Sequence, residues 1–234
     1  MKYYAGISLS LAILLTGCAF GSGNTIGGLK GQETQESDLD FANMDHAQVR
    51  DEYRELLDLV DDDFLKEQIE RRIAGVSMSG GDQEMAAGTK PSKGYYRDAI
   101  NSYIDILEKY PNSPDNAEVL YQLSKAYEME GEPKNAEIML NRLVTLHPDY
   151  KDIAEAHFRL GDINFNNQNY RAAEEHYRFV TTSSADNLKL NAHYMLSWAL
   201  YKRALFDDAL ESFAFVLDSV LDEQATRTLT KAEK

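Results

Sequence analysis

The sequence offers few residues for chemistry, and the most informative of them is its single cysteine, Cys18. One cysteine cannot form a disulfide within the chain, nor can it supply a cysteine-rich zinc site. It follows a start that carries Lys2, an apolar run over residues 5–15 and the small Gly17. This layout predicts a secretory signal, because the apolar run is shorter than the about 20 residues that a membrane-spanning helix needs.

Three other groups of residues suggest chemistry, but each lacks part of the required pattern. The stretch GVSMSGG has Ser79 where a nucleophile elbow needs its second glycine, and it follows a helical pattern instead of a strand. The acidic run 61–63 lacks the spaced ligands and turn glycine of a calcium loop. His157 and His193 are 36 residues apart without accompanying carboxylates, so we favour equivalent packing positions over a metal pair. The sequence therefore predicts no catalytic site, no metal and no cofactor, and a protein that is not an enzyme.

The composition limits which classes of partner the protein can bind and how large its hydrophobic core can be. The formal net charge is −15, so a polyanion such as nucleic acid would be repelled, and we exclude it as a partner. Hydrophobic residues make up 43% of the chain, which is enough for a core of ordinary size. Without a disulfide or a zinc site, that core must be held by helix packing.

The stretch LLTGC at residues 14–18 resembles the lipobox of bacterial lipoproteins. The resemblance implies cleavage before Cys18 and a lipid on the new N-terminus, and Ala19 in the following position implies the outer membrane, facing the periplasm. The alternative is an ordinary signal peptide followed by a buried free cysteine. We expect a signal peptide over residues 1–17 and a flexible lipidated tether, rich in Gly, Ser and Thr, over residues 18–44.

Apolar residues recur at three or four positions from Val49 through Tyr53 and Leu56, and again beyond Phe64. This period predicts amphipathic helix. The acidic run 61–63 offers an N-cap in the middle, so we expect a helical hairpin over residues 45–76. One long coiled-coil helix is the alternative. Residues 77–94 are dense in Gly, Ser and Pro and predict a flexible linker.

Four alanines recur at nearly constant spacing between residues 99 and 209. Ala99, Ala136, Ala173 and Ala209 are separated by 37, 37 and 36 residues. A large apolar residue follows four positions after each alanine, and a second amphipathic segment precedes the last three copies. A constant period of this length indicates a repeat protein whose unit is two helices.

This pattern resembles the tetratricopeptide repeat (TPR) across residues 95–221. Pro111 and Pro148 end helices as the family proline does, and Gly131 lies in a turn between helices. Ser124 and Ser197 depart from the family by replacing the small glycine, and the first copy lacks a clear first helix. We therefore expect about three complete repeats behind a half repeat. The lengthened units are similar to those of envelope TPR lipoproteins of the outer-membrane assembly and Tol-Pal-associated groups. The predicted fold class is all-α, a TPR-like solenoid preceded by a helical hairpin and a lipidated tether.

The resemblance implies that a partner binds the concave face formed by the first helix of each pair. The positions of this sequence that match that face are Tyr121, Lys125, Glu128, Met129, Phe158, Asp162, Phe165, Asn166, Tyr194, Trp198, Tyr201 and Lys202. Aromatic and charged side chains together suit a peptide or protein segment. The alternative is that some of these aromatics only pack between repeats.

We therefore expect a membrane-anchored adaptor or scaffold that binds other cell-envelope proteins. The alternatives are a structural subunit of an outer-membrane assembly complex, or the N-terminal part of a larger protein with an enzymatic or further repeat domain. The expectation of a larger protein rests on the polar tail at residues 222–234, which is a poor cap for a solenoid. It indicates a truncated chain or a continuation into more repeats.

Overall fold

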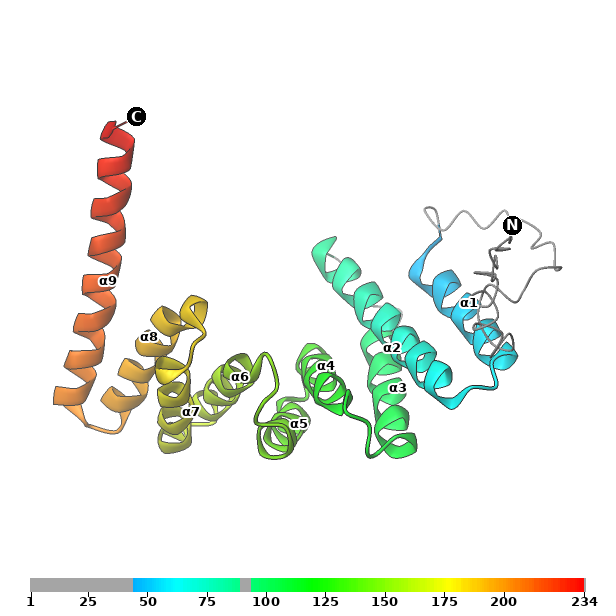
Figure 1. Cartoon of the computed structure of the whole chain (residues 1–234). Helices are drawn as coiled ribbons and strands as arrows, with labels where there is room; N and C mark the ends of the chain where they lie inside the picture. Colours follow the sequence, from blue (N-terminus) through cyan, green and yellow to red (C-terminus); the bar gives the residue numbers. More distant parts are fainter. Residues whose placement is uncertain (1–43, 89–93, 234) are drawn as a thin grey trace, which may run out of the picture. The chain divides into compact units, whose positions relative to one another are not determined.

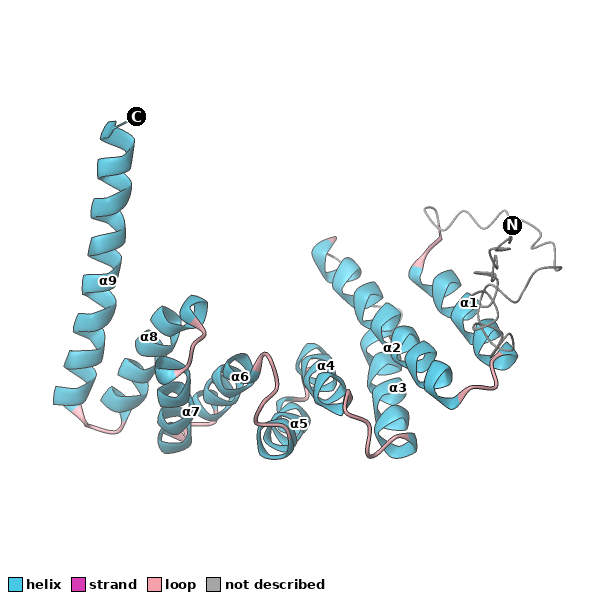
Figure 2. Ribbon diagram, in the orientation of Figure 1, coloured by secondary structure: helices cyan, strands magenta, loops and turns pink. Residues whose placement is uncertain are grey.

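The computed structural model describes residues 44–88 and 94–233, which form helices joined by turns (Figures 1 and 2). The predicted signal peptide, Cys18 and the tether up to residue 43 lie outside the described residues. The helices are α1 (His46–Leu59), α2 (Asp63–Ala86), α3 (Tyr95–Lys109), α4 (Asn116–Met129), α5 (Pro133–Leu146), α6 (Ile153–Asn166), α7 (Tyr170–Thr182), α8 (Asp186–Lys202) and α9 (Phe206–Glu233). Strands are absent from this part of the chain, and the predicted all-α class is confirmed.

Each helix packs mainly against its neighbours in the sequence, and the helices group into the pairs α2/α3, α4/α5, α6/α7 and α8/α9. The second helix of every pair carries one of the four periodic alanines. Ala99, Ala136 and Ala173 are completely buried, and Ala209 is 3% exposed. The small side chain lets the two helices of a pair approach closely. The predicted two-helix unit is therefore present in the structure.

The chain breaks between α1 and α2, where the acidic run lies. At the start of α1, the Asp45 carboxylate accepts a hydrogen bond from the backbone N–H of Gln48 at 2.9 Å, and the Gln48 side chain accepts one from the Asp45 N–H. At the start of α2, the Asp62 carboxylate accepts from the N–H of Leu65 at 2.8 Å. Each cap satisfies donors that a helix start leaves free. The acidic run thus caps a second helix, and the chain forms a hairpin here instead of one long helix.

Helix α2 overturns the flexible linker predicted from residue 77, because it continues to Ala86. Three of the small residues that suggested a linker, Ser77, Gly80 and Gly81, are buried, and the two glycines lie against α3. A Cβ on Gly80 would lie 2.9 Å from the Tyr95 ring, and one on Gly81 would lie 2.6 Å from the Tyr96 ring. The glycines therefore admit two tyrosines at a close helix crossing. Helix α2 supplies the first helix that the first repeat lacked in the sequence, so the described residues hold four pairs where about three and a half repeats were expected.

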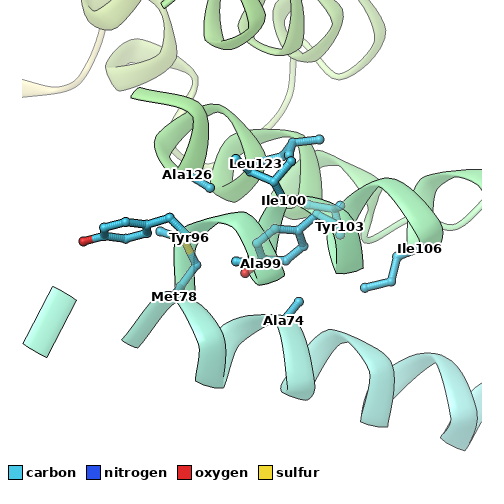
Figure 3. Packing of buried hydrophobic residues seen from close by; sticks show 10 residues of the cluster. Ala74, Met78, Tyr96, Ala99, Ile100, Tyr103, Ile106, Leu123 and Ala126 are labelled. Atoms are coloured by element: carbon cyan, nitrogen blue, oxygen red, sulfur yellow. The ribbon is translucent and has the colours of Figure 1, made fainter. Parts of the chain in front are cut away.

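The first of three buried clusters joins α2, α3 and α4 (Figure 3). Ala74 and Met78 come from α2, and Leu123 comes from α4, on either side of the α3 residues Ala99 and Tyr103. A second cluster joins α4, α5 and α6, and a third joins α7, α8 and α9. The core is therefore a succession of small clusters, each shared between neighbouring helices, as expected of a repeat protein.

The turn between the two helices repeats with the same period as the alanines. Gly131, Gln168 and Ala204 all have a left-handed backbone, with φ of 76°, 62° and 61°. In the first of these turns the N–H of Glu132 bonds the carbonyl of Tyr127 at 2.8 Å, which closes the end of α4. Glycine adopts this backbone without strain, but Gln168 and Ala204 do not. The turn geometry is thus held by the repeat even where the sequence does not favour it.

The polar tail predicted at residues 222–234 is helical as far as Glu233, the last described residue. Helix α9 runs from Phe206 to Glu233 with no break at residue 222. The segment contains neither proline nor glycine, so nothing in it ends a helix.

Candidate protein-binding surface

The twelve residues predicted to bind a partner lie on α4, α6 and α8, which are the first helices of successive pairs (Figure 1). Helix α4 carries four of them, α6 four and α8 four. The structure places these residues in three different settings, which are a hollow, the buried core and an exposed aromatic cluster.

Two hollows lie along these helices and share side chains. One, of about 730 Å³, is lined by residues of α4, the following turn, α6 and α8, among them Glu128, Phe158, Asp162 and Asn166. The other, of about 330 Å³, lies between α6 and α8 and adds Tyr194 to Phe158, Asp162 and Asn166. Five of the predicted residues therefore come together around one continuous concave region, which we call the central hollow.

The central hollow is acidic. Arg159 donates hydrogen bonds to Glu128 at 2.6 Å and to Glu155 at 3.3 Å, so one guanidinium serves two carboxylates. Asp162 accepts a hydrogen bond from the Tyr177 hydroxyl at 2.7 Å, and Arg159 acts on it only at longer range, without an ion pair. Burial raises the pKa of both Glu128 and Asp162 above their usual values. Desolvated carboxylates of this kind gain from a cation brought by a ligand.

Two of the predicted residues pack against other aromatic rings, Tyr121 as a buried side chain and Phe165 as a half-buried one. Tyr121 is 6% exposed and lies 5.7 Å from the Tyr150 ring, with the Arg159 guanidinium 5.7 Å from its own ring centre. Phe165 packs edge-on against Tyr170 of the second helix in its pair, at 5.3 Å. The alternative of packing between helices thus describes Tyr121 and Phe165. The Nζ of Lys125 lies 5.9 Å above the Tyr121 ring.

An aromatic cluster covers the last pair. The Trp198 ring meets Tyr194 at 6.3 Å and Tyr201 at 5.9 Å, all three on α8 and all at least a third exposed. Two α9 residues complete it, with Phe213 at 5.4 Å from Trp198 and Phe206 at 5.6 Å from Tyr201. The sequence prediction missed both phenylalanines, although Phe213 follows the repeat alanine Ala209 by four residues. The other two predicted residues, Met129 and Lys202, are exposed at the ends of α4 and α8.

A further hollow of about 560 Å³ lies between α1, α2 and α4, and the sequence prediction missed it. Its lining includes His46, Arg71, Arg72 and Glu118. Arg71 also donates to the Ser113 hydroxyl at 3.1 Å, which ties α2 to the turn before α4. The sequence pattern did not indicate this hollow, because residues 77–86 of α2 were predicted to be a linker.

The two repeat-equivalent histidines occupy matching positions. The Nδ1 of His157 lies 3.0 Å from that of His176, and the Nδ1 of His193 lies 3.3 Å from the Ser212 hydroxyl. Each ring also packs on a phenylalanine of the second helix in its pair. Burial, with a smaller effect of His176, lowers the pKa of His157 to about 4. Among the described residues no group of three or more His, Cys, Asp or Glu side chains is placed to hold a metal ion.

The fold and the repeated helix pairs define the class of protein, which is that of TPR proteins. Residues 85–194 match the sequence family YfiO, described as outer membrane lipoprotein. The chain therefore has the TPR fold, and over this range it is similar to outer membrane lipoproteins, as the sequence resemblance predicted. No curated protein sequence matches the chain significantly.

Solved structures of TPR proteins share the fold. The crystal structure of MamA is 21% identical, covers 77% of this chain and 92% of its own, and has a TM-score of 0.55. A TPR protein from Parabacteroides merdae is 15% identical, covers 75% of this chain and 60% of its own, and has a TM-score of 0.57. The TPR-like repeats of a kinesin light chain from Podosopora anserina are 14% identical, cover 77% and 89%, and have a TM-score of 0.54. These similarities establish the TPR solenoid. None of the helices in the described part of the chain is long and apolar enough to cross a membrane.

Proposed function

We propose that this protein is a lipid-anchored scaffold that holds other cell-envelope proteins through the central hollow and the adjoining aromatic cluster. The observation that carries the proposal is the meeting of Phe158, Asp162, Asn166 and Tyr194 around one concave region between α6 and α8. A helical-repeat array presents such a surface without any catalytic chemistry.

The chemistry of the surface favours one kind of ligand. The aromatic rings of α8 and α9 offer large, rigid contact area, which suits apolar side chains of a protein segment. The carboxylates of Glu128, Glu155 and Asp162 outnumber the two cations near them, Arg159 and Lys125. The ligand is therefore an extended segment that combines an apolar residue with Lys or Arg.

The anchor is proposed at Cys18. The lipobox resemblance and the matched family of outer membrane lipoproteins both support a lipid at this position and a site at the outer membrane, facing the periplasm. Each buried methylene group contributes about 0.8 kcal/mol, so several acyl chains give lasting attachment. The same family match favours the second candidate function, a structural subunit of an outer-membrane assembly complex.

The binding surface is tested with a photo-cross-linking amino acid at position 194 in the native envelope, and with a matched control at position 64. Phe64 is 67% exposed at the start of α2, away from the proposed surface. We expect an adduct with one defined protein from position 194 and none from position 64. Equal or absent adducts at the two positions would overturn the surface assignment.

The identified partner is then titrated against the full chain, with the emission of Trp198, the only tryptophan, as the signal. We expect the double variant Tyr194→Ala with Trp198→Ala to bind at least tenfold more weakly while its helical circular dichroism is retained. Because this variant lacks the tryptophan, its binding is measured through a fluorescent label on the partner. The control Phe64→Ala should bind as the wild type does. Loss of helical signal in the double variant would show that the rings support the fold instead.

The anchor is tested separately by the mass of the mature protein and by membrane fractionation. We expect wild-type protein to begin at an acylated Cys18 and Cys18→Ala protein to leave the membrane. Wild-type protein without fatty acid would refute the anchor and leave the binding surface untouched.

A further inference from the structure

Helix α9 carries a second apolar stripe that the described helices leave exposed, apart from an edge contact between Phe206 and Tyr201 of α8. Ala209 and Ser212 face α8 and are buried. A different side of α9 carries four large apolar residues, Phe206, Leu210, Leu217 and Leu221. Their spacing of 4, 7 and 4 residues puts all four on one side of the helix, about a quarter-turn or more from the buried side. They are 53%, 67%, 58% and 52% exposed. We call these four residues the α9 stripe.

The preceding pair shows what covers this position in the repeat. Glu174 of α7 stands 36 residues before Leu210 and is only 9% exposed, because α8 packs against α7. Its carboxylate pairs with Arg203, at the end of α8. Of the described helices, α8 is the one that packs extensively on α9, and Figure 1 shows α9 following it at the end of the described pairs. The occupant that fits the stripe is therefore an amphipathic helix in the orientation that α8 takes on α7.

The charge beside the stripe selects the occupant further. Each stripe residue is followed directly by a carboxylate, at Asp207, Glu211, Asp218 and Asp222. One residue turns an α-helix by about 100°, so these four carboxylates form a continuous edge along the stripe. No Lys or Arg occurs between residues 206 and 222.

We propose that the α9 stripe docks a basic amphipathic helix of a partner protein, whose leucine-like face covers the stripe and whose Lys or Arg residues meet the carboxylate edge. A second copy of this chain is a poor occupant, because it would bring the same acidic edge against its own. Within the protein, Arg–Glu pairs join successive units in the same way, as at Arg159 and Glu128 and at Arg97 and Glu132. This surface is separate from the central hollow.

The test measures fluorescence anisotropy of a labelled synthetic helix against the full chain in mild detergent. The probe is a peptide of about 20 residues with leucines along one face and lysines beside them, and its matched control has glutamate at each lysine. We expect the lysine peptide to bind at least tenfold more tightly than the glutamate peptide, and the difference to shrink at high salt. Equal binding of the two peptides would overturn the proposal.

Variants locate the binding on the chain. Leu210→Lys with Leu217→Lys should abolish capture of the lysine peptide, and so should Glu211→Lys with Asp218→Lys. The control Leu59→Lys alters an 81% exposed leucine on α1 and should bind normally. Tyr194→Ala with Trp198→Ala should also bind normally, so failure of the groove function and failure of this proposal give different results. A concentration-dependent dimer of the wild type that Leu217→Lys dissociates, with no peptide binding, would assign the stripe to a second copy and refute the proposal.

Discussion

The crossing of α6 and α7 gives a sharp test of how tightly a helix pair is packed. A Cβ added at Gly161 would lie 2.5 Å from Cε1 and 2.7 Å from Cδ1 of Tyr177. The Tyr177 ring is completely buried, and its hydroxyl is fixed by the 2.7 Å hydrogen bond to Asp162, so it cannot swing away freely. Overpacking of this kind costs about 1–3 kcal/mol, and alanine recovers about 1 kcal/mol through its higher helix propensity. We expect Gly161→Ala to lower the free energy of unfolding by up to about 2 kcal/mol.

A second helical glycine provides the matched control. Gly75 lies inside α2, and a Cβ there would meet nothing within 4 Å. Gly75→Ala should therefore raise the free energy of unfolding by up to about 1 kcal/mol through helix propensity alone. Urea unfolding followed by circular dichroism at the helix band compares the two variants with the wild type. If Gly161→Ala proves as stable as Gly75→Ala, the close contact with Tyr177 does not determine the packing of this pair.

Three further changes follow from the same structure. Burial lowers the pKa of His157 to about 4 in the folded state, below its value in the unfolded chain. The free energy of unfolding should therefore be at its full value above pH 6.5 and fall by about 1–2 kcal/mol toward pH 4, allowing for the partial exposure of the ring. The double variant His157→Phe with His176→Phe should lose less stability over this range, as measured by urea unfolding at each pH. Tyr177→Phe leaves Asp162 without its donor and should cost about 1–2 kcal/mol, read from the unfolding midpoint. Asp62→Ala removes the cap of α2 and should cost about 1 kcal/mol, whereas Asp62→Asn should cost much less in the same measurement.

The periodic alanines were sufficient to predict the helix pairs from the sequence, because each close helix crossing requires a small residue and the crossings recur at a constant spacing along the chain. The linker prediction failed for a related reason. Gly80 and Gly81 read as a mobile segment when counted with their Ser and Gly neighbours, but they serve as contact sites for Tyr95 and Tyr96. Nothing in the local sequence distinguishes a glycine that admits a ring from one that loosens the chain. The partner of a glycine belongs to another helix, and only the fold brings it near.

The serines that replace the family glycine follow from the same argument. Gly161 is required because the residue across the pair is the large, fixed Tyr177, with its ring against the helix backbone. At the equivalent position of the preceding pair, Ser124 is completely buried, and the residue that corresponds to Tyr177 is Leu140, a smaller side chain without a polar end. The Ser124 hydroxyl bonds the Tyr121 carbonyl at 2.6 Å and is satisfied within its own helix. At Ser124 the departure from the family pattern therefore goes with a smaller residue at the position equivalent to Tyr177.

The predicted surface shows why repeat position alone does not define a binding site. Tyr121, Phe158 and Tyr194 hold the same place in three successive first helices, 37 and 36 residues apart. Tyr121 is 6% exposed because Tyr150 and Arg159 of the following segment pack on its ring, whereas Tyr194 is 46% exposed. One repeat position therefore contributes to the core in one pair and to the surface in another, according to what the next unit supplies. Since affinity comes from rings that are desolvated only on binding, specificity for a partner should concentrate at the α8 end of the array.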